Sequence, residues 1–391
     1  MTLCVGEVDT ALLHRAFELL CRKFPILRGT IELTGGGAEL HIPDDSSSAA
    51  TVDIAAGPIA GRLGRDVAPL DPARTLAELT TVSEGATTAV ALRISHAIND
   101  ATLGFALLAH FWHAAAALAG TVEYPDPTPV YPLSLEHAYL ARAMDLPAPA
   151  VPTGGPVRGL AVDDVGAGTG FGPDLAQRIT LSQADTAALL GRARAAGTTL
   201  HALLAAAIVR AERATITEST DAATELPMIM FHLADLRPHL CPAARPDEVT
   251  NALAFAPTIT VCEHGTDLGV LAKQVKTQIV DGIEGGTALA VMLAAASAAA
   301  HGRARETVGN FITNWGVVPD LPVPAGLEIV DFRGFATSEP VSWVGYFVST
   351  FAGRCSIELA FSSRFHPPAQ IAELRELIVA NLAQLNHPPL P

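Results

Sequence analysis

The sequence predicts a two-domain α/β protein, built as an α+β sandwich. Its 391 residues are more than one ordinary hydrophobic core organises, which favours two domains. Hydrophobic residues make up 49% of the chain and charged residues 17%, a balance typical of a globular protein rather than a disordered one. Segments with strand-like and helical patterns alternate in both halves of the sequence, and each half contains enough strands for one sheet.

The first domain is predicted to cover residues 1–150. A helix is expected to begin at a cap formed by Asp9 or Thr10 and to end before Pro25, because apolar residues recur between them at helical spacing. Strands are expected in "ILRGTIEL" and shortly after "TGGG". In "TTAVALRIS", apolar residues alternate with small or polar ones, which predicts a buried strand. The apolar period then changes to four, which predicts a helix over residues 101–118.

Segments rich in proline and glycine predict a crossover linker over residues 151–174. The second domain is predicted to cover residues 175–391. It is expected to begin with a strand and two helices in "QRITLSQADTAALLGRARAAGTTLHALLAAAIVRAE", where Ser182 can cap the first helix. Further strands are expected in "ELPMIMFHLADLRPHL", "AFAPTITVCE" and "SIELAFSSRF". A helix in "PPAQIAELRELIVANLAQL" is expected to close the chain.

Charge and composition exclude several classes of partner. The formal net charge is -15 and no run of Lys or Arg is present, which argues against nucleic acid and against an anionic membrane surface. The longest apolar stretches fall short of the roughly 20 residues that a membrane span needs, so none is expected. The five cysteines form no CxxC pair and the chain starts without the features of a leader peptide. We therefore expect a reduced, cytoplasmic protein.

Several catalytic signatures are missing or incomplete. The sequence contains no GxSxG elbow and no GxxxxGK[ST] loop. The segment "GAGTGFG" at residues 166–172 misses the GxGxxG spacing and follows no expected strand, which favours a linker over a phosphate-binding loop. His110 and His113 lie three apart on a helix, but no HExxH motif or nearby acid accompanies them. They are interpreted as helix-face histidines near the core edge, and no metal site is predicted.

His96 and Asp100 stand between the buried strand and the following helix. One interpretation is structural: a satisfied core histidine beside an aspartate that caps the helix. The other is catalytic. The strand alternation points His96 inward, and partly apolar surroundings disfavour the imidazolium, so that a neutral ring can accept a proton as a general base. Spacing alone leaves both interpretations open.

The segment "SHAINDA" resembles the HHxxxDG motif of the chloramphenicol acetyltransferase-like superfamily, which includes condensation domains and polyketide-associated acyltransferases. His96 matches the second histidine of the motif and Asp100 matches its aspartate. Four other segments are similar to this superfamily in the same order: "GEVDTALLHRAFELLCRKFPILRGTIE", "FHLADLRPHLCPAARPDEVTNALAFAPT", "VGNFITNWGVVPDLP" and "SIELAFSSRFHPPAQIAELRELI". The likeness covers nearly the whole chain and points to the polyketide-associated branch, which contains the phthiocerol dimycocerosyl transferases.

The sequence departs from the superfamily pattern at three places. Ser95 stands where the motif has its first histidine, and Ala101 stands at the motif glycine, where a small residue fits if its φ is negative. Relatives also carry a strand before the segment that begins here at Gly6. Because the sequence begins almost at that point, this strand is expected to be missing and the site to be more open.

The resemblance implies two chloramphenicol-acetyltransferase-like domains that form a pseudo-dimer with a tunnel at their interface. His96 would take the proton from a hydroxyl or amine that attacks a thioester carbonyl. No covalent acyl-enzyme is implied, because no activated Ser or Cys accompanies it. Asp100 would support the motif by pairing with Arg237, for which a surface arginine is the alternative. Ser95, Asn314 and Trp315 would line the tunnel; for the last two, the alternative is simple packing beside a turn.

The expected function is therefore acyl transfer from an acyl carrier protein or coenzyme A thioester to an alcohol or amine, in polyketide, lipid or natural-product biosynthesis. No bound cofactor is expected; phosphopantetheine or coenzyme A serves as co-substrate. Both donors are phosphorylated, so Arg303 and Arg305 are candidates for carrier docking, with a solvated face as the alternative. The runner-up is a condensation-like fold that binds a carrier-bound intermediate for cyclisation or recruitment. A Ser or Cys hydrolase, which would form an acyl-enzyme, is not expected.

Overall fold

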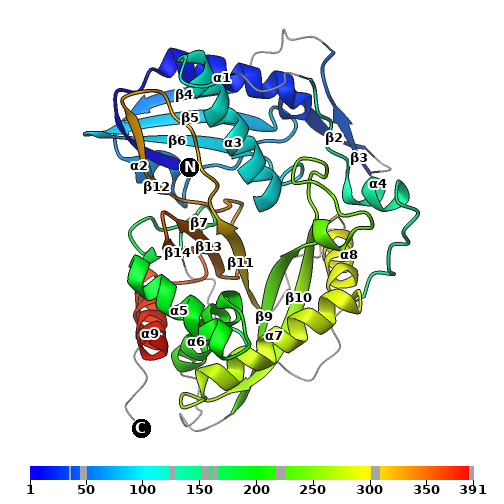
Figure 1. Cartoon of the computed structure of the whole chain (residues 1–391). Helices are drawn as coiled ribbons and strands as arrows, with labels where there is room; N and C mark the ends of the chain where they lie inside the picture. Colours follow the sequence, from blue (N-terminus) through cyan, green and yellow to red (C-terminus); the bar gives the residue numbers. More distant parts are fainter. Residues whose placement is uncertain are drawn as a thin grey trace.

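The computed structural model describes residues 1–34, 37–44, 51–123, 128–150, 158–160, 166–216, 225–300 and 309–386. Two α/β halves, each with its own sheet, lie one above the other in Figure 1. The mainly blue and cyan N-terminal half is at the top, and the green to red C-terminal half is below it. The predicted α/β class with two domains is confirmed.

The N-terminal half is a five-stranded sheet with two long helices packed on it. Its strands, in spatial order, are β12 (Leu327–Phe332), β1 (Thr2–Gly6), β6 (Thr87–Ile94), β5 (Ala77–Glu84) and β4 (Thr51–Ala56). The helices are α1 (Thr10–Lys23) and α3 (Ala101–Leu118), and the shorter elements are η1 (Pro25–Arg28), α2 (Ile59–Leu63) and the hairpin of β2 (Thr30–Thr34) and β3 (Gly37–His41). Phe17, Leu79, Val90 and Phe111 belong to the core that α1, α3 and the sheet share.

Both long helices of this half begin at an aspartate. Asp9 caps α1, because its Oδ1 accepts the Leu12 N–H at 3.0 Å. Asp100 caps α3 in the same way through the Leu103 N–H at 3.0 Å. The bounds of α3 agree with the helix predicted over residues 101–118.

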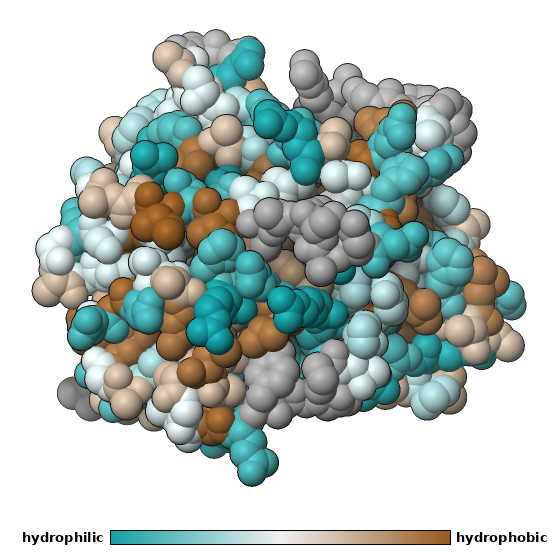
Figure 2. Space-filling model, turned by 90° about the horizontal axis from the view of Figure 1, so that it is seen from above, coloured by the Kyte–Doolittle hydropathy of each residue, from teal (hydrophilic) through white to brown (hydrophobic). Residues whose placement is uncertain are grey.

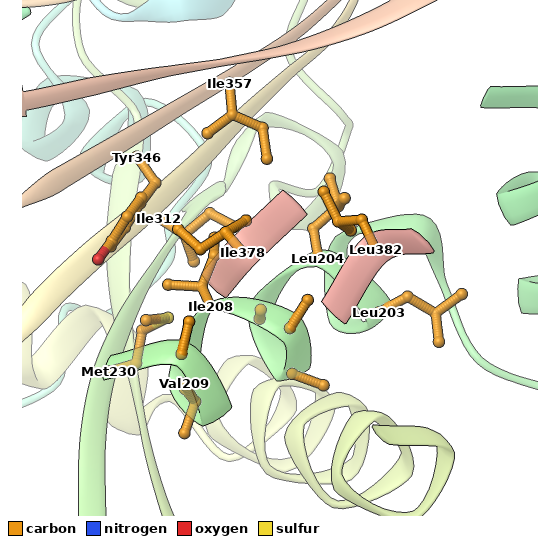
Figure 3. Packing of buried hydrophobic residues seen from close by; sticks show 14 of the residues in the cluster. Leu203, Leu204, Ile208, Val209, Met230, Ile312, Tyr346, Ile357, Ile378 and Leu382 are labelled. Carbon is orange, nitrogen blue, oxygen red and sulfur yellow. The ribbon is translucent and has the colours of Figure 1, made fainter. Parts of the chain in front are cut away.

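The C-terminal half is a mixed seven-stranded sheet with helices on its face. The strands run in the order β10 (Leu253–Cys262), β9 (Leu226–Asp235), β11 (Asn310–Val317), β13 (Gly345–Phe351), β14 (Arg354–Phe361) and β7 (Gly172–Pro173), and β8 (Ile179–Thr180) also pairs with β14. The helices are α5 (Gln183–Ala195), α6 (Leu200–Thr215), α7 (Leu268–Glu284), α8 (Thr287–Ala300) and α9 (Pro368–Asn386). Ile208 of α6 and Ile378 of α9 point toward Ile312 of the sheet, so these elements share one apolar core (Figure 3).

The two halves exchange elements, and this differs from the division predicted at residues 151–174. Helix α4 (Leu135–Leu140) packs with Leu236 and Val249 of the C-terminal half. Strand β12, orange in Figure 1, leaves the C-terminal half and pairs with β1 of the N-terminal sheet. Segments rich in proline and glycine predict where regular secondary structure ends. They do not indicate which hydrophobic core the next helix or strand packs into.

The strand that was expected to be missing is present. Thr2–Gly6 forms β1, which lies between β12 and β6 and is antiparallel to both. Thr2 and Cys4 are buried on one side of this strand. The expectation was wrong because the five residues before the first helix are enough to fill a position between two other strands.

Among the residues described, α3 alone has the length and apolar composition of a single membrane-crossing helix; α7 with the first part of α8 meets the same test as one span bent by 79°. In this structure α3 is a core helix, since Leu103, Leu107, Phe111 and Trp112 are buried against the rest of the N-terminal half. The face seen from above mixes hydrophilic and hydrophobic residues (Figure 2).

Candidate active site between the two halves

A cavity of about 610 Å³ lies between the two halves. The N-terminal half contributes the end of β6, the start of α3 and the segment 63–72. The C-terminal half contributes residues of β9, β10, β11 and β13 and the segment 333–341, and Phe332 at the end of β12 also lines the cavity. A site of this size, shared by two domains, is typical of small-molecule binding.

His96 lines this cavity from the turn that follows β6. The prediction that its ring is directed inward into partly apolar surroundings is wrong, because the strand ends at Ile94 and the alternation no longer applies; His96 is exposed. Its Nδ1 lies 2.6 Å from the backbone oxygen of Asn99. Since a carbonyl oxygen only accepts, Nδ1 carries the hydrogen and Nε2 of the neutral ring holds the lone pair that a general base needs.

Asp100 is buried and its carboxylate is fully engaged. Oδ1 accepts hydrogen bonds from Leu103 N and from Arg237 Nη2 at 3.1 Å. Oδ2 accepts from Arg237 Nη1 and from Ala252 N, both at 2.8 Å. Arg237 is therefore a buried partner and not a surface arginine. With both oxygens paired, Asp100 holds the turn and cannot also take part in proton transfer.

The Arg237 guanidinium extends this network within the C-terminal half. It donates to Asp235 Oδ1 at 3.0 Å and to the oxygen of Val249 at 2.5 Å. Thr102 on α3 donates to the other oxygen of Asp235 at 2.8 Å. The turn that carries His96 is thus fastened to the opposite half by charged and polar bonds that are largely withdrawn from solvent.

Asn251 contacts His96 directly, although no motif in the sequence points to it. Its Nδ2 donates to the backbone oxygen of His96 at 3.1 Å and lies 3.4 Å from the ring Nδ1. The residue immediately precedes Ala252, which binds Asp100. The available signal was weak: a polar side chain among small and apolar residues, just before an expected strand.

Strand β11 brings Trp315 to the cavity but turns Asn314 away. Trp315 and Thr313 line the cavity, as alternate residues of one strand do. Asn314 is on the other side, where its Oδ1 accepts the N–H of Gly316 at 2.9 Å, so its assignment to the tunnel lining is wrong. Gly316 has a φ of +81°, which supports a local irregularity in the pairing with β13. Ser95 lines the cavity as predicted.

Aromatic rings form a large part of the wall. Trp315 packs edge-to-face on Phe105 at 5.9 Å and on Phe347 at 6.3 Å between ring centroids. Phe332 contacts both Phe105 and Trp315. These contacts hold the indole ring in place at the interface.

Ionic residues of the lining are mostly neutralised by partners. Arg93 donates to Glu78 at 2.8 Å, and Arg333 makes two hydrogen bonds to Glu358 at 2.7 and 2.8 Å. The exposed Glu339 has no ion-pair partner among the described residues. The cavity therefore favours neutral, apolar groups with a few hydroxyl contacts.

Four other residues singled out in the sequence remain to be placed. Arg303 and Arg305 lie outside the described residues. His110 packs edge-to-face on Phe24, and its pKa is lowered by burial. His113 Nε2 bonds instead to the backbone oxygen of Glu123 at 3.0 Å, so the two histidines turn to different partners.

Comparisons with known proteins show which family and which folds the chain is similar to. Residues 173–360 match the family described as phthiocerol/phthiodiolone dimycocerosyl transferase C-terminus. No curated protein matches the sequence. Polyketide synthase associated protein 5 from Mycobacterium tuberculosis is similar in structure, with a TM-score of 0.74, 23% identity, and coverage of 100% of this chain and 93% of that one.

Two further solved structures share the architecture at lower identity. TRI3 trichothecene 15-O-acetyltransferase from Fusarium sporotrichioides has a TM-score of 0.69 and 13% identity, and the match covers 98% of this chain and 90% of that one. The epimerization domain from the third module of tyrocidine synthetase B has a TM-score of 0.63 and 13% identity, and the match covers 99% of this chain and 92% of that one. The family match confirms the predicted resemblance to the phthiocerol dimycocerosyl transferases over residues 173–360, and the solved structures show that the fold of the whole chain is shared with an acetyltransferase.

Proposed function

We propose that the protein transfers an acyl group from a thioester to an alcohol or amine, with His96 as the general base. The observation that carries this proposal is the position of His96 on the interdomain cavity, with Nδ1 bonded to the Asn99 oxygen. Nε2 takes the proton of the acceptor hydroxyl or amine while the acceptor oxygen or nitrogen attacks the thioester carbonyl. The tetrahedral intermediate then collapses, the C–S bond breaks, and the imidazolium returns the proton to the thiolate.

The remaining residues bind and orient. Asp100 and Arg237 fix the turn, and the wall around Trp315 receives the apolar parts of donor and acceptor. Holding two substrates in one cavity supplies much of the rate, because it converts a bimolecular encounter into a positioned reaction. We propose a carrier-protein or coenzyme A donor, a cytoplasmic location and a role in polyketide, lipid or natural-product biosynthesis. Arg303 and Arg305 remain candidates for carrier docking.

The test is thiol release from acyl-thioesters in the presence of model alcohols and amines, followed by mass spectrometry. We expect the His96→Ala variant to release thiol at least about 100-fold more slowly than wild type, since general bases contribute factors of about 10² to 10⁴. His14→Ala is the matched control, because His14 is a partly exposed histidine of α1 that lies away from the cavity, 3.7 Å from Glu18. A His96→Ala rate within a few-fold of the wild-type rate contradicts the proposal.

The runner-up is binding of a carrier-bound intermediate for cyclisation or recruitment without transfer. Its support is that the same fold is found in an epimerization domain, so the architecture hosts other roles. Ser95 in place of the first motif histidine also fits this alternative. Binding of the thioester without thiol release favours the runner-up, and a trapped acyl-enzyme indicates a hydrolase.

A further inference from the structure

We infer that Asn251 is a positioning residue that holds the His96 turn from the opposite half of the molecule. This inference rests on the proposed function, because it concerns the placement of the proposed base. Asn251 and His96 are 155 positions apart in the sequence and belong to different halves. The side-chain amide donates to the His96 backbone oxygen at 3.1 Å, which fixes the residue that carries the ring and not only the ring itself.

Asp100 fastens the far end of the turn to the C-terminal half, and the backbone around His96 has only local constraints besides Asn251. Ser95 N donates to Leu76 O at 2.8 Å, which ties the turn to the N-terminal half, and Ile98 N donates to Ser95 O at 3.1 Å within the turn. The Nδ1 bond of His96 to Asn99 is also local. Since His96 is exposed, packing does not fix its backbone oxygen, and Asn251 is the residue of the C-terminal half that bonds to this oxygen directly.

Asn251 itself stands on a well-anchored segment, Val249–Ala252. Val249 O accepts from Arg237 Nη2, and Thr250 N donates to Leu133 O at 2.8 Å. Ala252 N donates to Asp100 Oδ2. Residues on both sides of Asn251 are therefore held, so its amide is presented at a defined place. A side chain supported in this way can keep a reacting group within the small tolerance that catalysis requires.

The reaction should respond to this contact mainly in its chemical step. A displaced base still allows substrates to bind, but the proton transfer is then misaligned, and a misplacement of about 1 Å can cost about 100-fold in rate. We expect Asn251→Ala to lower kcat by about 10- to 100-fold and to change KM by no more than about twofold. Gln183→Ala is the matched control, since Gln183 makes an amide-to-carbonyl bond to Ala352 at 2.7 Å on the surface of α5.

A second variant gives a readout that a merely structural role would not move. Asn251→Asp has the same shape but places a carboxylate where the amide lies 3.4 Å from His96 Nδ1. A nearby negative charge favours the imidazolium, so the acidic limb of the kcat/KM profile should move to higher pH by about one unit or more. Asn251→Ala should not show this upward shift. Folding of each variant is checked by its thermal unfolding curve.

The outcomes separate this inference from the proposed function. If wild-type protein shows no transfer that depends on His96, the proposed function fails. If wild type transfers in a His96-dependent way but Asn251→Ala retains the wild-type kcat, the positioning role is refuted and the proposed function stands, whatever the pH profile of Asn251→Asp. A lower kcat with an unchanged KM and a shifted profile in the Asp variant supports the inference.

Discussion

The Glu212 carboxyl is a buried acid that the proposed reaction does not use. It lies on α6, where Oε1 accepts hydrogen bonds from Asn310 Nδ2 at 2.7 Å and from the Tyr346 hydroxyl at 2.6 Å. The Asn310 oxygen accepts the N–H of Val344 at 2.6 Å, so the cluster joins α6 to the starts of β11 and β13. Burial raises the pKa of Glu212 to about 7, although both hydrogen bonds oppose the shift. The group is thus a stability element that depends on pH.

Replacing Glu212 by glutamine should remove a loss of stability that wild type suffers as the pH rises from 4.5 through about 7. The unfolded carboxyl releases its proton near pH 4.5, whereas the folded one keeps it up to about 7. Its favourable contribution is therefore complete below pH 4.5 and is lost as pH rises through about 7. We expect the free energy of unfolding of Glu212→Gln, relative to wild type, to rise by about 3 kcal/mol between pH 4.5 and pH 8.

The measurement is urea unfolding of both proteins at several pH values. His201, whose burial lowers its pKa to about 4, titrates in both proteins and so cancels from the comparison. A difference between the two proteins that stays constant from pH 4.5 to 8 would show that Glu212 does not carry the raised pKa.

Single residues were predictable from the sequence only where a local motif or the resemblance named them. The spacing of His96 and Asp100 indicated the turn, and the resemblance implied the pairing with Arg237 that the structure contains. The inward burial of His96 was wrong because strand alternation was carried beyond the end of the strand. Asn251 escaped notice because its partner is distant in sequence, and only the docked halves bring the two together.

At the level of elements, the alternating glycines of residues 166–172 acquire a physical reason. A Cβ on Gly166 or Gly168 would come within 1.8 or 2.5 Å of Ser363 atoms. A Cβ on Gly170 or Gly172 would come within 2.5 or 2.9 Å of the Arg65 backbone. Between them, Phe171 exchanges two backbone hydrogen bonds with Ser338 of the cavity segment.

For residues 166–172, the sequence predicted the irregular backbone but not the contacts that the segment makes. The spacing of its glycines argues against a phosphate-binding loop. The segment was expected to be a linker, and in the structure it packs tightly against neighbouring backbone. The identity of those neighbours was not predictable, because Arg65 and Ser363 lie in different halves and far away along the chain. Helices with clear caps, such as α3, were predicted with their bounds because capping and apolar periodicity are local properties.

Gly170→Ala should destabilise the protein, because the new methyl group would meet the Arg65 backbone oxygen at 2.5 Å and backbone cannot move aside cheaply. Overpacking of this kind costs about 1–3 kcal/mol. Gly191→Ala is the matched control: Gly191 lies in α5 with open space around its Cβ position, and alanine should stabilise the helix by about 0.5–1 kcal/mol. Urea unfolding midpoints compare the two, and equal midpoints for both variants would contradict the close contact at Gly170.

On the scale of the whole molecule, the halves are joined by exchange of elements as well as by contact. Helix α4 reaches the C-terminal half and β12 returns to the N-terminal sheet. Chain length and the alternating strand and helix patterns predicted the two-domain α/β class. They did not predict that α4 and β12 pack with the other half, because a local pattern does not indicate which core an element joins. The cavity and the His96 turn both depend on this joining, since each draws residues from both halves.

The Asp100–Arg237 pair should account for much of the coupling between the halves. Asp100→Asn removes the charge but keeps a side chain that can cap α3, so it isolates the ion pair from the cap. Arg237→Met removes the other charge. Arg237→Met leaves the buried Asp100 charge without a counter-ion, so we expect it to lower the free energy of unfolding by about 3–5 kcal/mol. Asp100→Asn leaves Arg237 paired only with the partly exposed Asp235, so its loss should be smaller. In the double variant no charge of this pair remains unpaired, so its loss should be smaller than the sum of the two by about 0.5–3 kcal/mol.

Urea unfolding of wild type and of the three variants closes this double-mutant cycle. Arg245 and Asp247 form the control pair, since the Arg245 side chain is 70% exposed and such surface pairs contribute about 0–1 kcal/mol. Additive losses at Asp100 and Arg237, within about 0.5 kcal/mol, would show that the two residues stabilise their own halves independently. Coupling well above that of the control pair means that the charges act together across the interface. In that case the same bond that steadies the proposed base also holds the two halves at the distance that forms the cavity.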